Sequence, residues 1–82
     1  MTTTGWLHCD SVRDGMFTDE LAVVVSRSNG TKESYFVPAT AVEKARSRVR
    51  VDLRESDSLF WATLPTSDLT TIPVSKARIE VK

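Results

Sequence analysis

The stretch YFVPATAVE at residues 35–43 decides the fold, because it recurs in altered form as TIPVSKARIE at residues 71–80. Each copy runs from a β-rich stretch through a branched residue and Pro into a short segment that ends in a branched residue and Glu. Proline has no backbone N–H to donate to a sheet ladder, so each copy predicts a strand end followed by a tight turn. Two copies are too few for a solenoid, which needs about three or more stacked units. The repeat therefore predicts a small all-β protein built from hairpins.

The first hairpin is predicted around Asn29-Gly30, after the β-branched run at residues 21–25. Asn-Gly tolerates positive φ at both positions, as the favoured two-residue hairpin turn requires. This turn sets Val23 opposite Phe36, and it leaves the other face to Ala22, Val24, Tyr35 and Val37. Both faces are then largely apolar, which is unusual for a sheet with one wet face. The hairpin is therefore either covered on both sides or carries an apolar outer surface.

The second hairpin is predicted from the strict alternation of residues 48–54 and 58–64. With Ser56-Asp57 at the centre of the turn, apolar residues face one another in three pairs, which a slip of one residue would destroy. These pairs are Leu53 with Phe60, Val51 with Ala62, and Val49 with Leu64. Phe36, Val51 and Phe60 are expected to meet in one core. The opposite face carries Trp61 across from Asp52, with Arg50 and Arg54 within diagonal reach.

The whole chain is predicted to be one all-β domain over residues 6–82, preceded by a flexible leader at residues 1–5. We expect a small barrel or roll of five to six antiparallel strands with short turns. Residues 38–48 form either a short helical turn or a 3₁₀ turn, placed near residues 39–47. The last short strands supply further core residues, namely Ile72, Val74, Ile79 and Val81. A closed arrangement would also remove exposed strand edges.

The segment FVPATAV at residues 36–42 resembles the end of an SH3-like small β-barrel, and Asp19-Glu20-Leu21 resembles the entry to the second strand of that family. The resemblance implies a barrel shape. Ala41 stands where the family has a ligand-binding tyrosine, and Val23 and Val24 replace its paired tryptophans. The early tyrosine motif is absent as well. The resemblance therefore implies a fold and carries over no ligand residue.

Composition narrows the classes of function. Eleven basic side chains balance eleven acidic ones in 82 residues, so no global attraction to nucleic acid or to anionic membrane is expected. Cys9 is the single cysteine and rules out an internal disulfide. The amino terminus has no apolar run of signal-peptide length, and no stretch is long enough to span a bilayer. These features predict a cytoplasmic protein that has no contact with a membrane.

Two arginine-containing patterns are candidate binding surfaces. Trp61 between Arg50 and Arg54 could stack a base and hold phosphates, or anchor a protein partner. The competing interpretation is a solvated face on which the arginine stems cover the indole. The alternation of Lys44, Arg46, Arg48 and Arg50 forms a cationic stripe if this stretch is extended, and disperses if it is helical. The candidate binding residues are Trp61, Arg50, Arg54, Arg46, Arg48, Tyr35 and Val24.

Catalysis and cofactor binding are not expected. His8 and Cys9 are adjacent on a predicted strand and point to opposite faces, and a lone His with a lone Cys falls short of a zinc site. No glycine-rich phosphate loop is present, and no Ser or Thr has a partner base. We predict a non-catalytic small β-barrel module that binds a protein partner or a second copy of itself. The alternative is a nucleic-acid-binding module that uses the face with Trp61 and the arginines.

Overall fold

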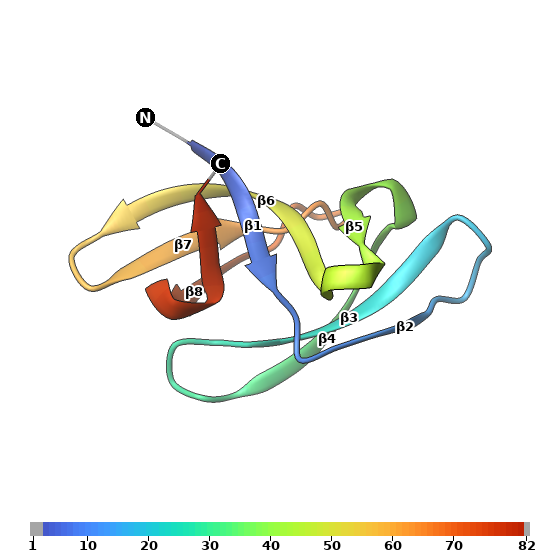
Figure 1. Ribbon diagram of the computed structural model, residues 1–82, viewed down its shortest axis with the longest axis horizontal. Coiled ribbons are helices and arrows are strands. Elements are labelled where there is room, and N and C mark those ends of the chain that lie inside the picture. Colours follow the sequence, from blue (N-terminus) through green and yellow to red (C-terminus); the bar gives the residue numbers. More distant parts are fainter. Residues whose placement is uncertain (1–2, 82) are drawn as a thin grey trace.

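The computed structural model describes residues 3–81 and confirms an all-β domain with short turns (Figure 1). Within these residues there are nine strands and three 3₁₀ turns, and no helix is long and apolar enough to cross a membrane. Residues 39–47, where one helical or 3₁₀ turn was expected, contain two 3₁₀ turns, η1 and η2, with the short strand β5 between them. The elements are β1 (Thr3–His8), β2 (Ser11–Asp14), β3 (Glu20–Ser26), β4 (Lys32–Pro38), η1 (Ala39–Ala41), β5 (Val42–Glu43), η2 (Lys44–Arg46), β6 (Arg48–Ser56), β7 (Leu59–Thr63), β8 (Thr71–Ser75), η3 (Lys76–Arg78) and β9 (Ile79–Val81).

The strands form two antiparallel sheets, an arrangement compatible with an SH3-like fold. A six-stranded sheet has the order β8-β7-β6-β1-β9, with β5 paired to β6, and a three-stranded sheet has the order β2-β3-β4. Figure 1 shows the smaller sheet below the larger one. Their inner faces meet in one core, because alternate residues of each strand point to the same side. The fully buried core side chains include Leu7, Val49, Leu53, Ile72 and Val74 from the larger sheet, Leu64 directly after β7, and Val23, Val25 and Val37 from the smaller sheet.

The repeated phrase corresponds to a repeated structural unit of strand, 3₁₀ turn and strand. The first copy is β4–η1–β5 and the second is β8–η3–β9. Pro38 ends its strand as predicted, whereas Pro73 lies in the middle of β8 and not at its end. The Pro73 carbonyl accepts a hydrogen bond from the Ser28 N–H at 2.8 Å, so the polar backbone positions of Pro73 face away from β7. The missing N–H of Pro73 therefore breaks no ladder bond, which is why the strand continues through it.

The predicted register of the first hairpin is wrong by one residue. Val23 lies opposite Tyr35 and not opposite Phe36. The turn is a three-residue loop, in which the Gly30 N–H bonds to the Arg27 carbonyl and Gly30 adopts a φ of 88°. A type I turn followed by a left-handed glycine is the usual form of such a loop. The extra residue turns Tyr35 and Val37 inward and puts Phe36 outside, so Phe36 is 47% exposed and does not join the core.

The second hairpin has the predicted faces but a register that differs by two residues. Leu53 pairs with Ala62, and Trp61 pairs with Arg54 instead of Asp52. The turn is centred on Asp57 and Ser58, and Asp57 adopts a positive φ of 39°. A shift of two preserves which side each residue faces, because side chains alternate with a period of two. The inner and outer sets of residues were therefore predicted correctly although their partners were not.

The expectation of a flexible leader over residues 1–5 is wrong for residues 3–5. Residues 3–5 already belong to β1, and residues 1–2 lie outside the described part of the chain. Gly5 is required in the strand, because an added Cβ would lie 2.5 Å from Leu53 Cδ1 and 2.7 Å from the Glu80 carbonyl oxygen. At the other end, Ile79 packs against the core as expected, but Val81 is 56% exposed at the sheet margin and is not a core residue.

Candidate functional site

Arg48 lies at the centre of a charged cluster on the outer face of the six-stranded sheet. It is 8% exposed although it is the first residue of β6 and shares its face with solvated positions. Its Nε donates a hydrogen bond to Glu43 Oε1 at 2.6 Å, and its Nη1 donates to Glu80 Oε2. A guanidinium can serve two carboxylates at once because its donors form a rigid planar fork. Arg48 therefore links β6 to β5 and to β9 through its two carboxylate partners.

Trp6 covers this cluster from the neighbouring strand. The Arg48 guanidinium carbon lies 4.4 Å from the centre of the Trp6 ring, and that of Arg50 lies 5.7 Å away. Both distances are within the range of cation–π attraction. His8 extends the cluster, with Nε2 at 2.8 Å from Glu80 Oε1. The indole of Trp6 is thus an arginine-stacked part of the sheet surface.

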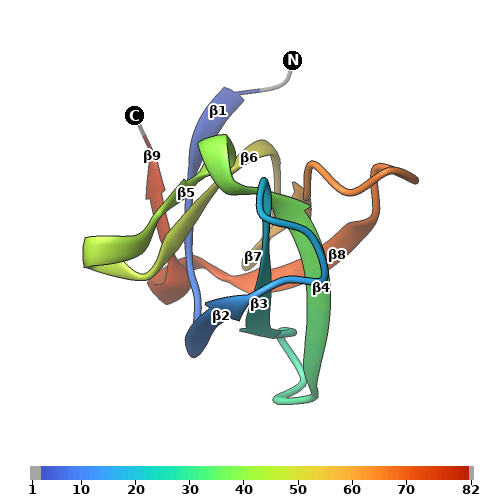
Figure 2. The same cartoon turned by 90° about the vertical axis from the view of Figure 1, so that its right-hand side faces the viewer.

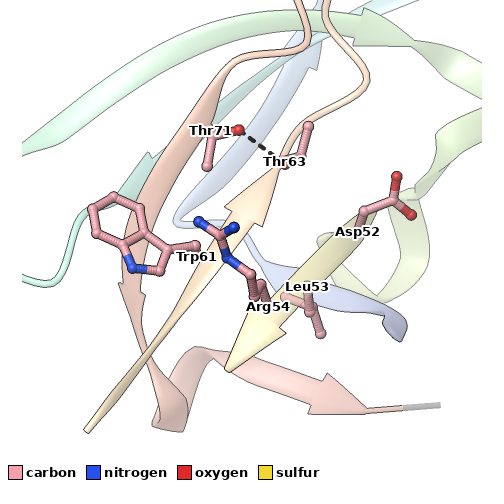
Figure 3. Close-up of a pocket in the computed structure, with 6 residues that line it drawn as sticks. All are labelled: Asp52, Leu53, Arg54, Trp61, Thr63 and Thr71. Atoms are coloured by element: carbon pink, nitrogen blue, oxygen red, sulfur yellow. Dashed lines mark hydrogen bonds between the residues drawn. The ribbon is translucent and has the colours of Figure 1, made fainter. Parts of the chain in front are cut away.

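Trp61, on β7, lies on the same outer face of the sheet, beside the end of β6 that is far from Arg48. It pairs with Arg54 on one side and with Pro73 of β8 on the other. Together with Asp52, Leu53, Thr63 and Thr71 it lines a hollow of about 160 Å³. Figure 3 shows Arg54 extending toward the indole while Asp52 points away from it, and Thr63 Oγ1 and Thr71 Oγ1 are hydrogen-bonded at 2.9 Å.

The positive charge of this face comes from Arg50 and Arg54. Both are exposed, and within residues 3–81 neither forms an ion pair. Asp52 stands between them on β6 and reduces the local charge. Arg54 pairs directly with Trp61, whereas Arg50 lies four residues further along β6, where it pairs with Trp6 and its guanidinium carbon lies 5.7 Å from the Trp6 ring. An aromatic ring beside a guanidinium group that has no ion pair can stack a planar group and attract an anion. We name the set Trp61, Arg50 and Arg54 the tryptophan face.

The structure separates the other predicted binding residues from this face. Arg46 lies on η2, 3.7 Å from Glu43, so the stripe from Lys44 to Arg50 is interrupted by a 3₁₀ turn and by the burial of Arg48. Val24 is half-buried on the outer face of the three-stranded sheet. Tyr35 faces inward and packs against the core, with its hydroxyl donating to Glu33 Oε2 at 2.9 Å.

A second surface consists of exposed apolar side chains from the β2–β3 loop, the end of β4 and the β7–β8 loop. Met16 and Phe17, between β2 and β3, are 75% and 68% exposed. Leu69, between β7 and β8, is 65% exposed, and Phe36 lies on β4. Three hollows connect these residues through shared walls, because Glu20 lines the hollows beside Phe17 and Phe36, and Pro65 lines those beside Phe36 and Leu69. We name the set Met16, Phe17, Phe36 and Leu69 the apolar belt.

The His8-Cys9-Asp10 segment takes no part in either surface. Cys9 is buried, and burial raises the pKa of its thiol to about 12, with a further contribution from the negative charge of Asp10. A thiol with such a pKa is a poor nucleophile and a poor metal ligand at neutral pH. Among the described residues no group of three or more His, Cys, Asp or Glu side chains is placed to hold a metal ion.

Sequence reasoning missed Trp6, Glu43 and Glu80. A signal for the two glutamates was present, because each copy of the repeated phrase ends in a branched residue followed by Glu, and in both copies this Glu follows the 3₁₀ turn. That both would bind one arginine could not be read from the sequence. Comparisons with protein-family models, with curated proteins and with solved structures gave no match.

Proposed function

We propose that this chain is a non-catalytic small β-barrel interaction module of SH3-like architecture that acts in the cytoplasm and binds a protein partner through the apolar belt. The observation that carries this proposal is the exposure of Met16, Phe17 and Leu69, each at least 65% accessible. Clusters of exposed apolar side chains mark interaction surfaces more often than isolated ones do. Aromatic and methionine side chains are also the types enriched where proteins bind one another.

The surroundings of the belt support a protein partner over a small molecule. The hollows beside Phe17 and Phe36 are shallow and are walled by loops as well as strands, whereas small-molecule pockets enclose most of their ligand. Asp14, Asp19 and Glu20 line the same hollows and give a polar rim around the apolar side chains. An apolar centre with a polar rim is the usual anatomy of a protein interface.

Site-specific photo-crosslinking tests the proposal. Benzoyl-phenylalanine replaces Phe17 or Phe36 in separate variants, and Ser58 in the turn between β6 and β7 serves as an exposed control position. We expect discrete protein adducts in expressing cells from positions 17 and 36 and none from position 58. Equal labelling at all three positions, or no adduct at positions 17 and 36, would contradict a partner on the apolar belt.

Nucleic-acid binding by the tryptophan face is a second candidate function, favoured by Arg54 beside Trp61 and by Arg50 further along the same face of β6, neither of which forms an ion pair in the described chain. Bases stack on tryptophan irrespective of sequence, and each neutralised phosphate of a single strand adds about −0.7 to the slope of log K against log salt. In a Trp6→Phe variant, Trp61 is the single tryptophan and reports binding of oligouridylate by quenching. No quenching at low salt, or quenching unchanged by Arg50→Gln with Arg54→Gln, would exclude this function.

A further inference from the structure

Strand β4 presents the longest free strand edge in the described part of the chain. The strands with a neighbour on one side only are β2, β4, β5, β8 and β9, which have four, seven, two, five and three residues. The edge of β8 is partly occupied, because the Ser28 N–H donates to the Pro73 carbonyl. Figure 2 shows β4 at the margin of its sheet with β3 on its inner side. An open edge of this length is a template for a further strand.

The pattern of hydrogen bonds identifies which groups of β4 are free. The Arg27 N–H donates to the Thr31 carbonyl, and the Ala39 N–H donates to the Asp19 carbonyl, at the two ends of the β3–β4 ladder. Along an antiparallel strand, the N–H and C=O groups of one residue bond to the neighbouring strand, and those of the next residue point toward the opposite edge. Glu33, Tyr35 and Val37 therefore bond to β3, and the N–H and C=O groups of Lys32, Ser34 and Phe36 face outward. Pro38 is the next outward residue and has no N–H.

We propose that β4 pairs antiparallel with β4 of a second copy of this chain, joining the two three-stranded sheets into one across a two-fold axis at Ser34. The inference rests on the proposed interaction function and names the partner as the chain itself. With the axis at Ser34, Lys32 faces Phe36 of the second copy, so all three outward residues find partners. Pro38 falls outside the ladder, where its missing N–H removes no bond.

This register also avoids like charges across the new pair of strands. Glu33 faces the second copy's Tyr35, and Ser34 faces its own equivalent. An axis at Glu33 would instead set two glutamates directly opposite each other, which is unfavourable. A two-fold contact is self-complementary, so the Lys32–Phe36 and Glu33–Tyr35 pairs each occur twice.

Charge complementarity supports a second copy as the occupant. Lys32 is exposed and forms no ion pair within residues 3–81. In the proposed dimer it approaches a groove of about 330 Å³ that is lined by Phe36, Pro38, Asp19 and Glu20, together with residues of the β7–β8 loop. The stem of a lysine can lie on the phenylalanine while its ammonium group meets the carboxylates. Glu20 pairs with Pro38 on the ladder, so it is close to the end of β4 that the second copy's Lys32 reaches.

The contact is small, and the dimer is expected to be weak. An edge-to-edge pairing of one strand lies at the lower limit of specific interfaces, below about 1,200 Å² of total buried area. We therefore expect a Kd on the order of 10–100 μM, with dimers at millimolar and monomers at low micromolar concentration.

Sedimentation velocity from low micromolar to millimolar concentration measures the dimer Kd of the native chain and of variants in which the charges at positions 32 and 20 are reversed. Lys32→Glu alone and Glu20→Lys alone place like charges together, and each is expected to weaken dimerisation about tenfold or more. The double variant K32E/E20K restores the opposite charges and is expected to return the dimer to within a few-fold of the native Kd. Circular dichroism confirms that each variant is folded. A native chain that stays monomeric at millimolar concentration overturns the proposal, and so does a double variant that is no better than the single ones.

Disulfide trapping tests the position of the axis independently. A Ser34→Cys variant places two thiols across the axis at a Cα separation of about 5.5 Å, which a disulfide can bridge. The native Cys9 is buried, and the raised pKa of its thiol keeps it unreactive. We expect rapid oxidation to a covalent dimer for this variant and slow oxidation for the exposed control Ser58→Cys. Equal rates would overturn the register. Photo-crosslinks to other proteins together with a strictly monomeric chain would refute self-pairing while leaving the interaction function intact.

Discussion

Replacing Arg48 with methionine removes the guanidinium group that Glu43 and Glu80 share, and we expect it to lower the free energy of unfolding by about 2–3 kcal/mol. Methionine keeps most of the apolar stem and so separates the loss of charge from the loss of packing. The change affects four strands at once, because Arg48 is on β6, Glu43 is on β5, Glu80 is on β9 and Trp6 is on β1.

The magnitude follows from the exposure of the partners. Breaking a fully buried ion pair costs about 3–5 kcal/mol, because the remaining charge is left without water. Here the side chains of Glu43 and Glu80 are 39% and 47% exposed, so both carboxylates can be rehydrated after the arginine is lost. Solvent screening reduces each charge-assisted hydrogen bond to about 0.5–1 kcal/mol. The stacked contact with Trp6 contributes about 1 kcal/mol more.

Urea denaturation followed by circular dichroism measures the loss directly, and thermal unfolding should show a decrease in Tm of about 10–20 °C for a domain of this size. Arg50→Met is the matched control, because Arg50 is exposed and lies 5.7 Å from the same indole. We expect this control to cost less than about 1 kcal/mol. Equal losses for the two variants would show that the cluster around Arg48 does not hold the strands together.

Four further changes test other parts of the structure. Gly5→Ala should lower the free energy of unfolding by about 1–3 kcal/mol in urea denaturation, since a Cβ there lies 2.5 Å from Leu53 Cδ1. Gly30→Ala should cost about 1 kcal/mol in the same assay, because the position has a φ of 88° but open space around it, and a cost equal to that of Gly5→Ala would contradict the assigned turn. The pKa of the Cys9 thiol is raised from 9.0 to about 12, so the unfolded thiol ionises first and stability falls as pH rises from about 9 to about 12. A Cys9→Ala variant should lose this part of the pH dependence, and iodoacetamide should label native Cys9 only after unfolding. The Ser26 hydroxyl and Arg78 lower the pKa of Asp10, so the stabilisation is present above its ordinary pKa of 3.8 and is lost as the pH falls below it. Acid titration of Ser26→Ala, followed by circular dichroism, should show unfolding at a higher pH than the native chain, and an unchanged midpoint would refute that role.

The faces of the second hairpin could be predicted from the sequence, whereas the partners of its residues could not. Val49, Val51 and Leu53 alternate with charged residues, and this period fixes which side of the strand is buried. The pairing depends on where the turn closes, and Ser56-Asp57 and Asp57-Ser58 are both acceptable turn centres. A shift of two residues leaves the alternation unchanged, so the sequence pattern could not reveal it.

The first hairpin shows the same limit with a larger consequence. Asn29-Gly30 locates the turn correctly, but it is compatible with a two-residue loop and with a three-residue loop that ends at Gly30. The three-residue loop moves Phe36 to the outside and Tyr35 to the inside. Packing of Val37 and Tyr35 against the opposite sheet decides between the two, and that sheet consists of residues distant in the sequence.

The sequence by itself determined the all-β class, the turns near Gly30 and Asp57, a tight turn after each repeated stretch and the buried faces of β6, β7 and β8. These follow from local preferences, since alternation, glycine and proline act over a few neighbouring residues. The tertiary structure alone brought Glu43, Glu80 and Trp6 to Arg48, and it alone left β4 at an open margin. Both depend on which strands become neighbours, and that choice is made by the burial of the whole core rather than by any short segment.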